Sequence, residues 1–386
     1  MRAVITDHGA VADGSTLNTS AIQAAIDACA EAGGGTVVFP PGRFVSGTLQ
    51  LRSRVGLDLE AGAVLVGSPR VEDYRESGFV HVDNHFSQLE GGQSLSLIYA
   101  SGEEEVSIRG TGTIDFSSDA FFDFTQIKPI VGVDESQLSP EQRSQAAVRK
   151  LDGPTQPIFF NQCRRVEVSG VKHMNAPSLT INLNSCSDVK IHHITIDDGL
   201  RVPISDGIHI CASTDVIISE SVFTCGDDCV AITGVTNWND VSERIIITNC
   251  TMNSSSAGVR VGYLAGKIRD VAISNLTIYN TTRGFTIFAG DDGYVENVTI
   301  QNIVMHTRIL AGDWWGKGEP LVIFAPGCNG HIRNIRVRGI TARSEQGAVI
   351  VGDRRNVSEI VLEDWWLELS RGRNFELFGG VIDMQP

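Results

Sequence analysis

The sequence has no long apolar run. No stretch of its 386 residues approaches the roughly 18 apolar residues that a membrane-spanning helix needs. The N-terminal segment also lacks the apolar core of a signal peptide, so we expect a cytoplasmic protein, or a secreted one whose signal was removed. No segment is of low complexity, and prolines number only 12. These absences exclude a membrane partner and a long disordered tail.

Positive charge is also scarce. Lys and Arg number 31 against 46 Asp and Glu, which gives a formal net charge of −15. A surface of this charge repels a phosphate backbone, so we exclude nucleic acid as a partner. An anionic polysaccharide would need a local cationic cleft. The acidic composition does not by itself indicate a charged partner, because a net charge also keeps a protein soluble.

The eight cysteines do not have the spacing of a zinc ribbon. Several occupy apolar strand positions, which predicts buried free thiols. Cys225 and Cys229 flank an aspartate pair and are close enough in sequence to form a local disulfide in an oxidising compartment. His192 and His193 fall within a predicted strand, so we expect neither a metal site nor another cofactor.

One short pattern recurs along most of the chain, with apolar residues at relative positions 0, 2, 5 and 7. Alternation with a period of two predicts strands, and the step of three marks a bend between two short strands. One coil of such strands cannot bury its own inner face, whereas stacked coils can. The intervals between copies are 23, 27, 29, 26, 27, 37 and 25 residues. The copies begin at Val166, Val189, Val216, Ile245, Val271, Val298, Ile335 and Ile360.

This repeat predicts an all-β fold, a right-handed parallel β-helix that forms a single domain over residues 1–386. Asn249, Asn275 and Asn302 take the same position in three consecutive copies, which suggests a ladder of hydrogen bonds between coils. Asparagine also tolerates the backbone of a turn, so it suits the bend.

Three segments depart from the repeat. Residues 18–32 have helical periodicity and precede three glycines, so we expect a helix that covers the first coil. Residues 116–155 are expected to form an insertion on one face. Residues 307–320 are expected to form a loop over a cleft.

A second strand follows the first pair in each coil, and its copies lie 22, 29, 26 and 36 residues apart. At these intervals the leading residues should stack in one column: Asp206, Asp228, Ala257, Arg283 and Glu319. The fourth residues should point outward beside this column: His209, Ala231, Arg260, Thr286 and Val322. Asp227 adjoins Asp228 at a turn, so three carboxylates meet within two adjacent coils.

Carboxylates this close repel each other and raise the pKa of at least one of them. Such a set suits general acid and base chemistry on a glycosidic bond. The structural alternative is a group of turn aspartates that holds calcium.

These residues resemble motifs of glycoside hydrolase family 28, the polygalacturonase family. The opening DHGAVADGSTLNTSAIQAAIDAC and GGGTVVFPPGRFVSG are similar to its N-terminal cap. Ser205-Asp206-Gly207 matches the family's Asn-Thr-Asp-Gly motif, with Ser205 and Ile204 in place of Thr and Asn, and Gly226-Asp227-Asp228 matches its aspartate pair. The resemblance implies hydrolysis with inversion, with Asp227 as the general acid and Asp206 and Asp228 activating water. Inversion usually requires an acid and a base roughly 6.5–9.5 Å apart.

Two family motifs are altered. Ser256-Ala257-Gly258 stands where the family has Gly-His-Gly, and Thr286-Ile287-Phe288 stands where it has Arg-Ile-Lys. The two cations that hold a galacturonate carboxylate in the family are therefore missing. Arg260 and Arg283 are candidates to replace them, unless they pair with acids of the column such as Glu319. The other candidates for substrate contact are His209, Trp314, Trp315, Lys317 and Glu319.

The sequence thus predicts an inverting glycoside hydrolase whose substrate is a uronic-acid-containing, pectin-type oligo- or polysaccharide, and exo-action is a further hypothesis. One alternative is the same chemistry on a neutral or rhamnose-containing glycan. Others are a polysaccharide lyase, since lyases also use parallel β-helices, and a non-catalytic carbohydrate-binding solenoid. The sequence does not indicate an oligomeric state.

Overall fold

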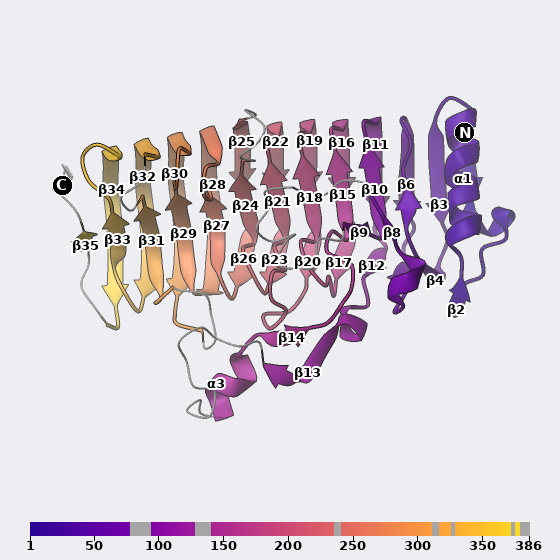
Figure 1. Ribbon diagram of the computed structural model, residues 1–386, viewed down its shortest axis with the longest axis horizontal. Coiled ribbons are helices and arrows are strands. Elements are labelled where there is room, and N and C mark those ends of the chain that lie inside the picture. Colours follow the sequence, from indigo (N-terminus) through magenta and orange to yellow (C-terminus); the bar gives the residue numbers. More distant parts are fainter. Residues whose placement is uncertain are drawn as a thin grey trace.

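Stacked parallel strands form almost the whole molecule. The computed structural model describes residues 1–77, 94–127, 140–234, 241–310, 316–325, 329–371 and 375–378. Within them, one sheet has 20 strands and a second has 11, and neighbouring strands pair in parallel. Successive coils lie side by side along the long axis (Figure 1). The predicted right-handed parallel β-helix is confirmed.

The larger sheet carries the repeat found in the sequence. Its strands are β1 (Arg2–Val4), β2 (Asp13–Leu17), β3 (Gly35–Phe39), β4 (Gly42–Ser46), β6 (Val55–Leu59), β7 (Ala63–Gly67), β11 (Glu104–Gly110), β12 (Thr113–Asp115), β16 (Arg164–Ser169), β17 (Lys172–Met174), β19 (Ser187–His192), β20 (Thr195–Asp197), β22 (Thr214–Ser219), β23 (Val222–Cys225), β25 (Ser242–Thr248), β26 (Thr251–Ser254), β28 (Lys267–Thr281), β30 (Tyr294–Thr307), β32 (His331–Ser344) and β34 (Val357–Leu369).

The smaller sheet carries the predicted column. Its strands are β5 (Leu49–Gln50), β10 (Ile98–Ser101), β15 (Ile158–Asn161), β18 (Ile181–Asn184), β21 (Ile208–Cys211), β24 (Val230–Thr233), β27 (Ala257–Val261), β29 (Arg283–Phe288), β31 (Glu319–Phe324), β33 (Ala348–Val351) and β35 (Phe375–Phe378).

The core consists of apolar side chains stacked on their equivalents one coil away. Val189 pairs in register with Val166 on one side and with Val216 on the other, and all three are buried. The same register continues to Ile360 at the last copy of the repeat. Each such side chain fills space between two neighbours of similar shape, so a change from Ile to Ala would cost about 2–5 kcal/mol.

Asparagines make the bend between the two short strands of a coil. Asn249, Asn275 and Asn302 each have φ near 56°, in the left-handed region that asparagine tolerates better than most residues. Their side chains form the predicted ladder, with amide-to-carbonyl distances of 3.2 Å and 3.3 Å between successive rungs. The ladder therefore satisfies polar side chains and supports a backbone bend at the same positions.

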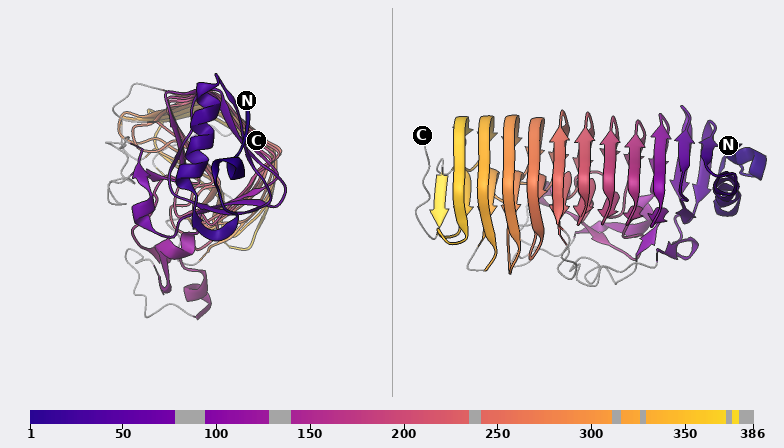
Figure 2. Two further views of the ribbon diagram at one scale, coloured as in Figure 1. Left: turned by 90° about the vertical axis from the view of Figure 1, so that its right-hand side faces the viewer. Right: turned by 90° about the horizontal axis from the view of Figure 1, so that it is seen from above.

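The helix α1 (Thr19–Glu31) lies across the N-terminal end of the stack (Figure 2). It buries the apolar face expected from the sequence, with Ile22, Ala25, Ile26 and Cys29 against the first coils. Gln23 completes the open edge of the smaller sheet at β5. Its side-chain amide accepts a hydrogen bond from the backbone N–H of Gln50 at 2.9 Å and donates one to the carbonyl of the same residue at 3.0 Å.

Within the expected insertion, the described residues 116–127 and 140–155 include elements that lie beside the stack of coils (Figure 1). They contain the 3-10 helix η3 (Ser118–Phe121), the antiparallel strands β13 (Phe122–Ile127) and β14 (Val148–Lys150), and the helix α3 (Pro140–Gln145). Shorter elements near the N-terminus are η1 (Ile5–His8), η2 (Val71–Asp73), β8 (Arg75–Glu76) and β9 (Leu95–Ser96). Part of the expected loop 307–320 lies outside the described residues. Among the described helices, none has the length and apolar character needed to cross a membrane.

Candidate active site

The candidate residues lie in the strands of the smaller sheet and in the turns that precede them. Arg283 pairs in register with Ala257 on one side and with Glu319 on the other, which confirms that part of the predicted column. Asp206 and Asp228 meet one coil apart, where the backbone N–H of Asp228 donates to the Asp206 carboxylate at 3.2 Å. The register of the second predicted column is confirmed as well, because His209, Ala231, Arg260, Thr286 and Val322 pair in turn.

A glycine permits the sharp turn before the aspartate pair. A Cβ atom on Gly226 would lie 1.8 Å from the carbonyl oxygen of Val202, so no other residue fits without a backbone shift. The hydroxyl of Ser205 accepts a hydrogen bond from the Gly226 N–H at 2.9 Å. The two aspartate motifs are therefore linked by the backbone as well as by their side chains.

Asp206, Asp227 and Asp228 converge in a nearly closed site. One carboxylate oxygen from each lies within 4.8 Å of the others. The three residues are 3%, 8% and 2% exposed, so Asp227 is the most accessible. This distance joins one selected oxygen of each residue, whereas the roughly 6.5–9.5 Å usual for an inverting pair is measured between whole carboxyl groups.

Asp228 is held by three donors. The Ser256 hydroxyl donates to its carboxylate at 2.8 Å, the backbone N–H of Ala257 donates at 3.0 Å, and the Nε of Arg260 donates to its other oxygen. Ala257 stands at the histidine position of the family motif. It contacts Asp228 through its backbone N–H and has no polar side chain to offer the acid cluster. These hydrogen bonds fix the orientation of Asp228 in a buried setting.

Arg260 supplies positive charge to the acid cluster. Its guanidinium contacts Asp228 and lies 3.7 Å from Asp206, and the ring of Tyr263 stacks against it at 5.2 Å. Burial by itself would lower the Arg260 pKa, but the charges of Asp228 and then Asp206 outweigh it and raise the pKa. The three carboxylates of this described cluster are groups that could bind a metal ion. Here the guanidinium of Arg260 places a positive charge beside two of them, Asp206 and Asp228.

His209 lies behind Asp206 and is buried. Its Nδ1 is 2.6 Å from the Asp206 carboxylate, and its Nε2 is 3.0 Å from the hydroxyl of Thr233. Burial lowers the His209 pKa to about 3, and the charge of Arg260 adds to this effect. His209 is therefore neutral near pH 7, so it donates its Nδ1 proton to Asp206 in a hydrogen bond rather than an ion pair.

The remaining candidates lie further along the column. The guanidinium of Arg283 donates to the Ser256 hydroxyl at 2.6 Å, so Arg283 reaches Asp228 through that serine. The Glu319 carboxylate accepts a hydrogen bond from the Lys317 backbone N–H at 2.5 Å, and burial raises the pKa of Glu319. The predicted contacts Trp314 and Trp315 lie outside the described residues.

Comparison with known proteins establishes the family. The model of "Glycosyl hydrolases family 28" matches residues 93–364, which is most of the chain. The chain belongs to this family. A second model, "Rhamnogalacturonase A/epimerase, pectate lyase-like", matches residues 1–79 at the N-terminal cap.

Family 28 relatives differ from this chain in length and sequence. It is 26% identical to a "Probable polygalacturonase" of Vitis vinifera, over 82% of this chain and 63% of that protein. It is 30% identical to an "Exo-poly-alpha-D-galacturonosidase" of Dickeya chrysanthemi, over 58% of this chain and 41% of that protein. The chain thus spans less than two thirds of the length of each. The crystal structure of a hyperthermoactive exopolygalacturonase from Thermotoga maritima has the same fold, with a TM-score of 0.76 and 22% identity over 99% of this chain and 92% of that one.

Within this family 28 site, Asp198 was missed by the reasoning from sequence. Its buried carboxylate accepts hydrogen bonds from the Ala176 N–H at 2.8 Å and from the Thr180 hydroxyl at 2.5 Å, and the N–H of Thr180 donates to the Asp206 carbonyl at 2.9 Å. Burial raises the Asp198 pKa to about 7. The sequence signal was slight, because Asp198 stands in an irregular turn outside the repeat.

Cys225 and Cys229 are both buried free thiols, so the local disulfide considered from the sequence is not formed. Burial raises the pKa of the Cys225 thiol, and the neighbouring Cys229 thiol adds to this effect. Both side chains belong to the core beneath the aspartate turn. They therefore act as small apolar residues there, as expected for the other cysteines.

Proposed function

We propose that this family 28 protein hydrolyses glycosidic bonds, with Asp227 as the general acid and with Asp206 and Asp228 activating the attacking water. The observation that carries the proposal is the unequal environment of three carboxylates in one buried cluster. Arg260 contacts Asp228 and lies 3.7 Å from Asp206, and of the three carboxylate charges that of Asp227 raises the Arg260 pKa least. A neighbouring cation stabilises a carboxylate, so Asp206 and Asp228 suit the role of base and Asp227 suits that of proton donor.

The reaction follows from these roles. Asp227 gives its proton to the glycosidic oxygen while a water held by Asp206 and Asp228 attacks the anomeric carbon and loses a proton to one of them. Arg260 and the Nδ1–H of His209 keep that pair oriented. We retain inversion as the stereochemical proposal, because the hydrogen bonds that hold Asp228 make it a poor nucleophile.

The short separation of the carboxylates makes stereochemistry a useful test. Proton NMR of the first product, recorded before the anomers equilibrate, should show the anomer opposite in configuration to the cleaved bond. A first product that keeps the original configuration would instead mean a covalent intermediate, which the oxygens within 4.8 Å of one another would permit.

We propose exo-action on a chain end. An endo-acting enzyme needs an open groove across several coils, but the outward column beside the acid cluster is covered along seven strands. The exposed fractions are 1% for Phe159, 1% for Asn182, 3% for His209, 0% for Ala231, 8% for Arg260, 1% for Thr286 and 2% for Val322. Two of the similar proteins named above are described as exo-acting. Product analysis should find only short products released from chain ends, with a slow fall in polymer viscosity.

For the substrate we propose a galacturonate-containing, pectin-type glycan, with Arg283 and Lys317 as candidate contacts of a uronate carboxylate. A neutral or rhamnose-containing glycan is a second candidate. It is favoured by Thr286 and Phe288, which stand at the positions of the two family cations, and by Arg260, which already contacts Asp228.

One assay tests the proposed activity. Wild type and Asp227→Asn should be compared on galacturonate-containing and neutral oligosaccharides, by reducing ends and by ultraviolet absorbance. Reducing ends without absorbance, lost in Asp227→Asn, are expected. An absorbing unsaturated product would establish a lyase, and binding without turnover in either protein would establish a carbohydrate-binding solenoid.

We also propose a cytoplasmic location. The seven described cysteines are buried free thiols, two of them side by side at the aspartate turn, which suits a reducing compartment. Fractionation of the native source tests this, and recovery from the extracellular medium would contradict it.

A further inference from the structure

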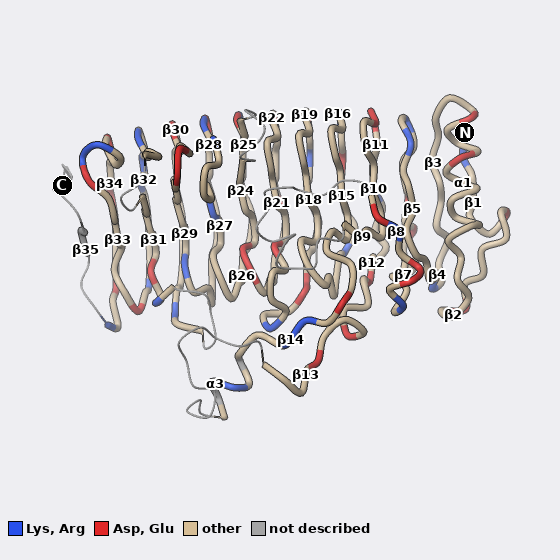
Figure 3. The backbone as a smooth tube through the Cα atoms, viewed as in Figure 1, with Lys and Arg blue, Asp and Glu red and all other residues tan. Residues whose placement is uncertain are grey.

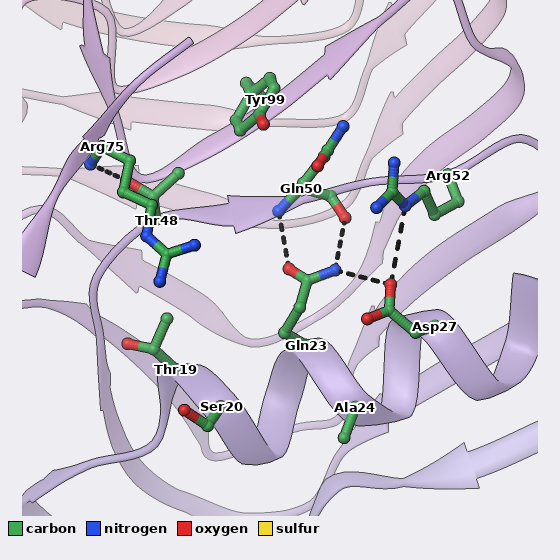
Figure 4. A pocket seen from close by; sticks show the side chains of 10 residues that line it. All are labelled: Thr19, Ser20, Gln23, Ala24, Asp27, Thr48, Gln50, Arg52, Arg75 and Tyr99. Atoms are coloured by element: carbon green, nitrogen blue, oxygen red, sulfur yellow. Dashed lines mark hydrogen bonds and ion pairs between the residues drawn. The ribbon is translucent and has the colours of Figure 1, made fainter.

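A second polar pocket lies at the N-terminal end of the molecule, between α1 and the first strands of the smaller sheet (Figure 4). We call it the cap pocket; its volume is about 440 Å³. Helix α1 provides one wall and the strands β5 and β10 provide the other. The residues that line it are Thr19, Ser20, Gln23, Ala24, Asp27, Thr48, Gln50, Arg52, Arg75 and Tyr99.

Positive charge predominates in the cap pocket. Its charged residues are Arg52, Arg75 and Asp27, and Asp27 lies 3.6 Å from Arg52. Arg75 is anchored through its backbone N–H, which donates to the Thr48 hydroxyl at 2.7 Å, and its guanidinium extends toward α1 (Figure 4). Basic and acidic residues are scattered over the other coils (Figure 3). In a chain of net charge −15, this hollow has one more arginine than aspartate in its lining, so its local charge is opposite in sign to that of the chain.

The cap pocket also offers an aromatic surface. Tyr99 pairs in register with Gln50, so the half-buried ring and the glutamine side chain project from the same face of the sheet. An arginine fork recognises a carboxylate, an aromatic ring packs against a sugar face, and the nearby amide and hydroxyl groups can bind sugar hydroxyls. This combination suits a sugar that bears a carboxylate.

The cap pocket lies on the face of the catalytic column. Tyr99 occupies the outward column three coils before His209, which places them about 14 Å apart at about 4.8 Å per coil. Phe159 and Asn182 lie between them in that column and are each 1% exposed. The cap pocket is thus separated from the acid cluster by covered residues and is a site of its own.

We propose that the cap pocket is an accessory site that binds a uronate unit of the same glycan whose end enters the active site; its ligand class rests on the proposed function. Arg75 binds the carboxylate, Arg52 assists where Asp27 permits, and Tyr99 packs against the sugar ring. When the cap pocket holds one part of a glycan chain, the effective concentration of the chain end at the active site is higher, so cleavage is faster. Long chains gain from this, whereas a dimer can occupy only one site at a time.

Binding is tested first in the Asp227→Asn protein, in which the substrate stays intact. Calorimetry with trigalacturonate should give two sites per chain. Arg75→Gln and Tyr99→Leu in the same background should each reduce this to one site, or weaken the second at least tenfold. Tyr99→Phe should retain both sites, because it keeps the ring. Arg336→Gln is the matched control, since Arg336 is an exposed arginine on the other sheet.

Kinetics of the otherwise wild-type enzyme supply a second measurement. Arg75→Gln should raise KM for polygalacturonate at least threefold, with kcat unchanged and with kcat/KM for digalacturonate unchanged. A single binding site in the parent protein, or equal KM values for the polymer, would overturn the proposal. Equal competition by inorganic phosphate would also overturn it, because the cap pocket would then bind any small anion.

The calorimetric and kinetic results separate the two proposals. If the wild-type protein lacks hydrolase activity but two sites are found and Arg75→Gln removes one, the proposed function fails and the binding site stands. If hydrolysis is observed but only one site is found, the accessory site fails alone.

Discussion

His209 and Asp206 form a buried pair in which a neutral histidine donates to a carboxylate. The pair requires a fixed tautomer, and Thr233 on the far side of the ring provides a partner for the second nitrogen. His209 therefore acts as a positioning residue, since it contacts Asp206 and lies behind it. Its pKa of about 3 means that it stays neutral across the ordinary working range of an enzyme.

Replacement of His209 should therefore reduce the rate more than the binding of substrate. We expect His209→Leu to lower kcat about ten- to a hundredfold with little change in KM, because loss of a hydrogen bond to a buried charge costs about 1.5–3 kcal/mol. His209→Asn keeps an N–H donor at a similar position and should restore most of the rate. The pH dependence of kcat should have the same shape in the wild type and in His209→Asn. A titration step that is present in the wild type and absent in the variant would mean that the histidine itself titrates.

Asp198 should make the stability of the protein depend on pH. Its folded-state pKa of about 7 exceeds the ordinary value of 3.8, so between these values the folded chain holds a proton that the unfolded chain releases. Stability from this group is therefore present at pH 4 and is lost as the pH rises toward 7 and above. Asp198→Asn should remove this loss of unfolding free energy. A pKa shift of this size corresponds to about a few kcal/mol at pH 8.

Urea denaturation at pH 5 and pH 8 measures this effect. The stability difference between Asp198→Asn and wild type should grow in favour of the variant at pH 8. Asp119→Asn is the control, because Asp119 is an exposed aspartate. A variant that weakens at pH 8 relative to pH 5 would show that the carboxylate form of Asp198 is the stabilising one.

At the scale of elements, α1 does more than cover apolar side chains. An edge strand leaves unpaired N–H and C=O groups, and Gln23 satisfies two of them at Gln50. We expect Gln23→Ala to lower the free energy of unfolding by about 1–3 kcal/mol, because both backbone groups lose their partner. Ser20→Ala, an exposed change on the same helix, should have little effect. Equal urea midpoints for the two variants would contradict this role.

The repeating elements were predictable from the sequence because each obeys a local rule. Apolar alternation predicted the strands, and asparagine at the bend predicted the ladder and a turn, whose backbone is left-handed in the structure. The partners of the aspartates were harder to foresee. Asp228 meets Ser256 only because a 28-residue connection returns the chain one coil later, and the sequence does not reveal which side of a turn faces the cleft.

At the scale of the whole molecule, the stacking of coils brings the predicted acids together, but the repeat in the sequence did not predict how deeply they are buried. The column of outward residues was placed correctly in register, yet its burial from Phe159 to Val322 could not be read from the strands. The position of Arg260 against Asp228 likewise depends on side-chain packing across two coils. Burial and charge pairing are therefore where the sequence was least informative.

Because each coil pairs only with the next, the fold also has a mechanical direction. A force applied to the C-terminal end meets one coil at a time, so the molecule should yield as a series of small events rather than in one rupture. Most intervals of the repeat are 23 to 29 residues, so each released coil of about 27 residues should lengthen the chain by about 9 nm. Optical tweezers would record this as a staircase; a single extension of the whole chain would show that the coils yield together.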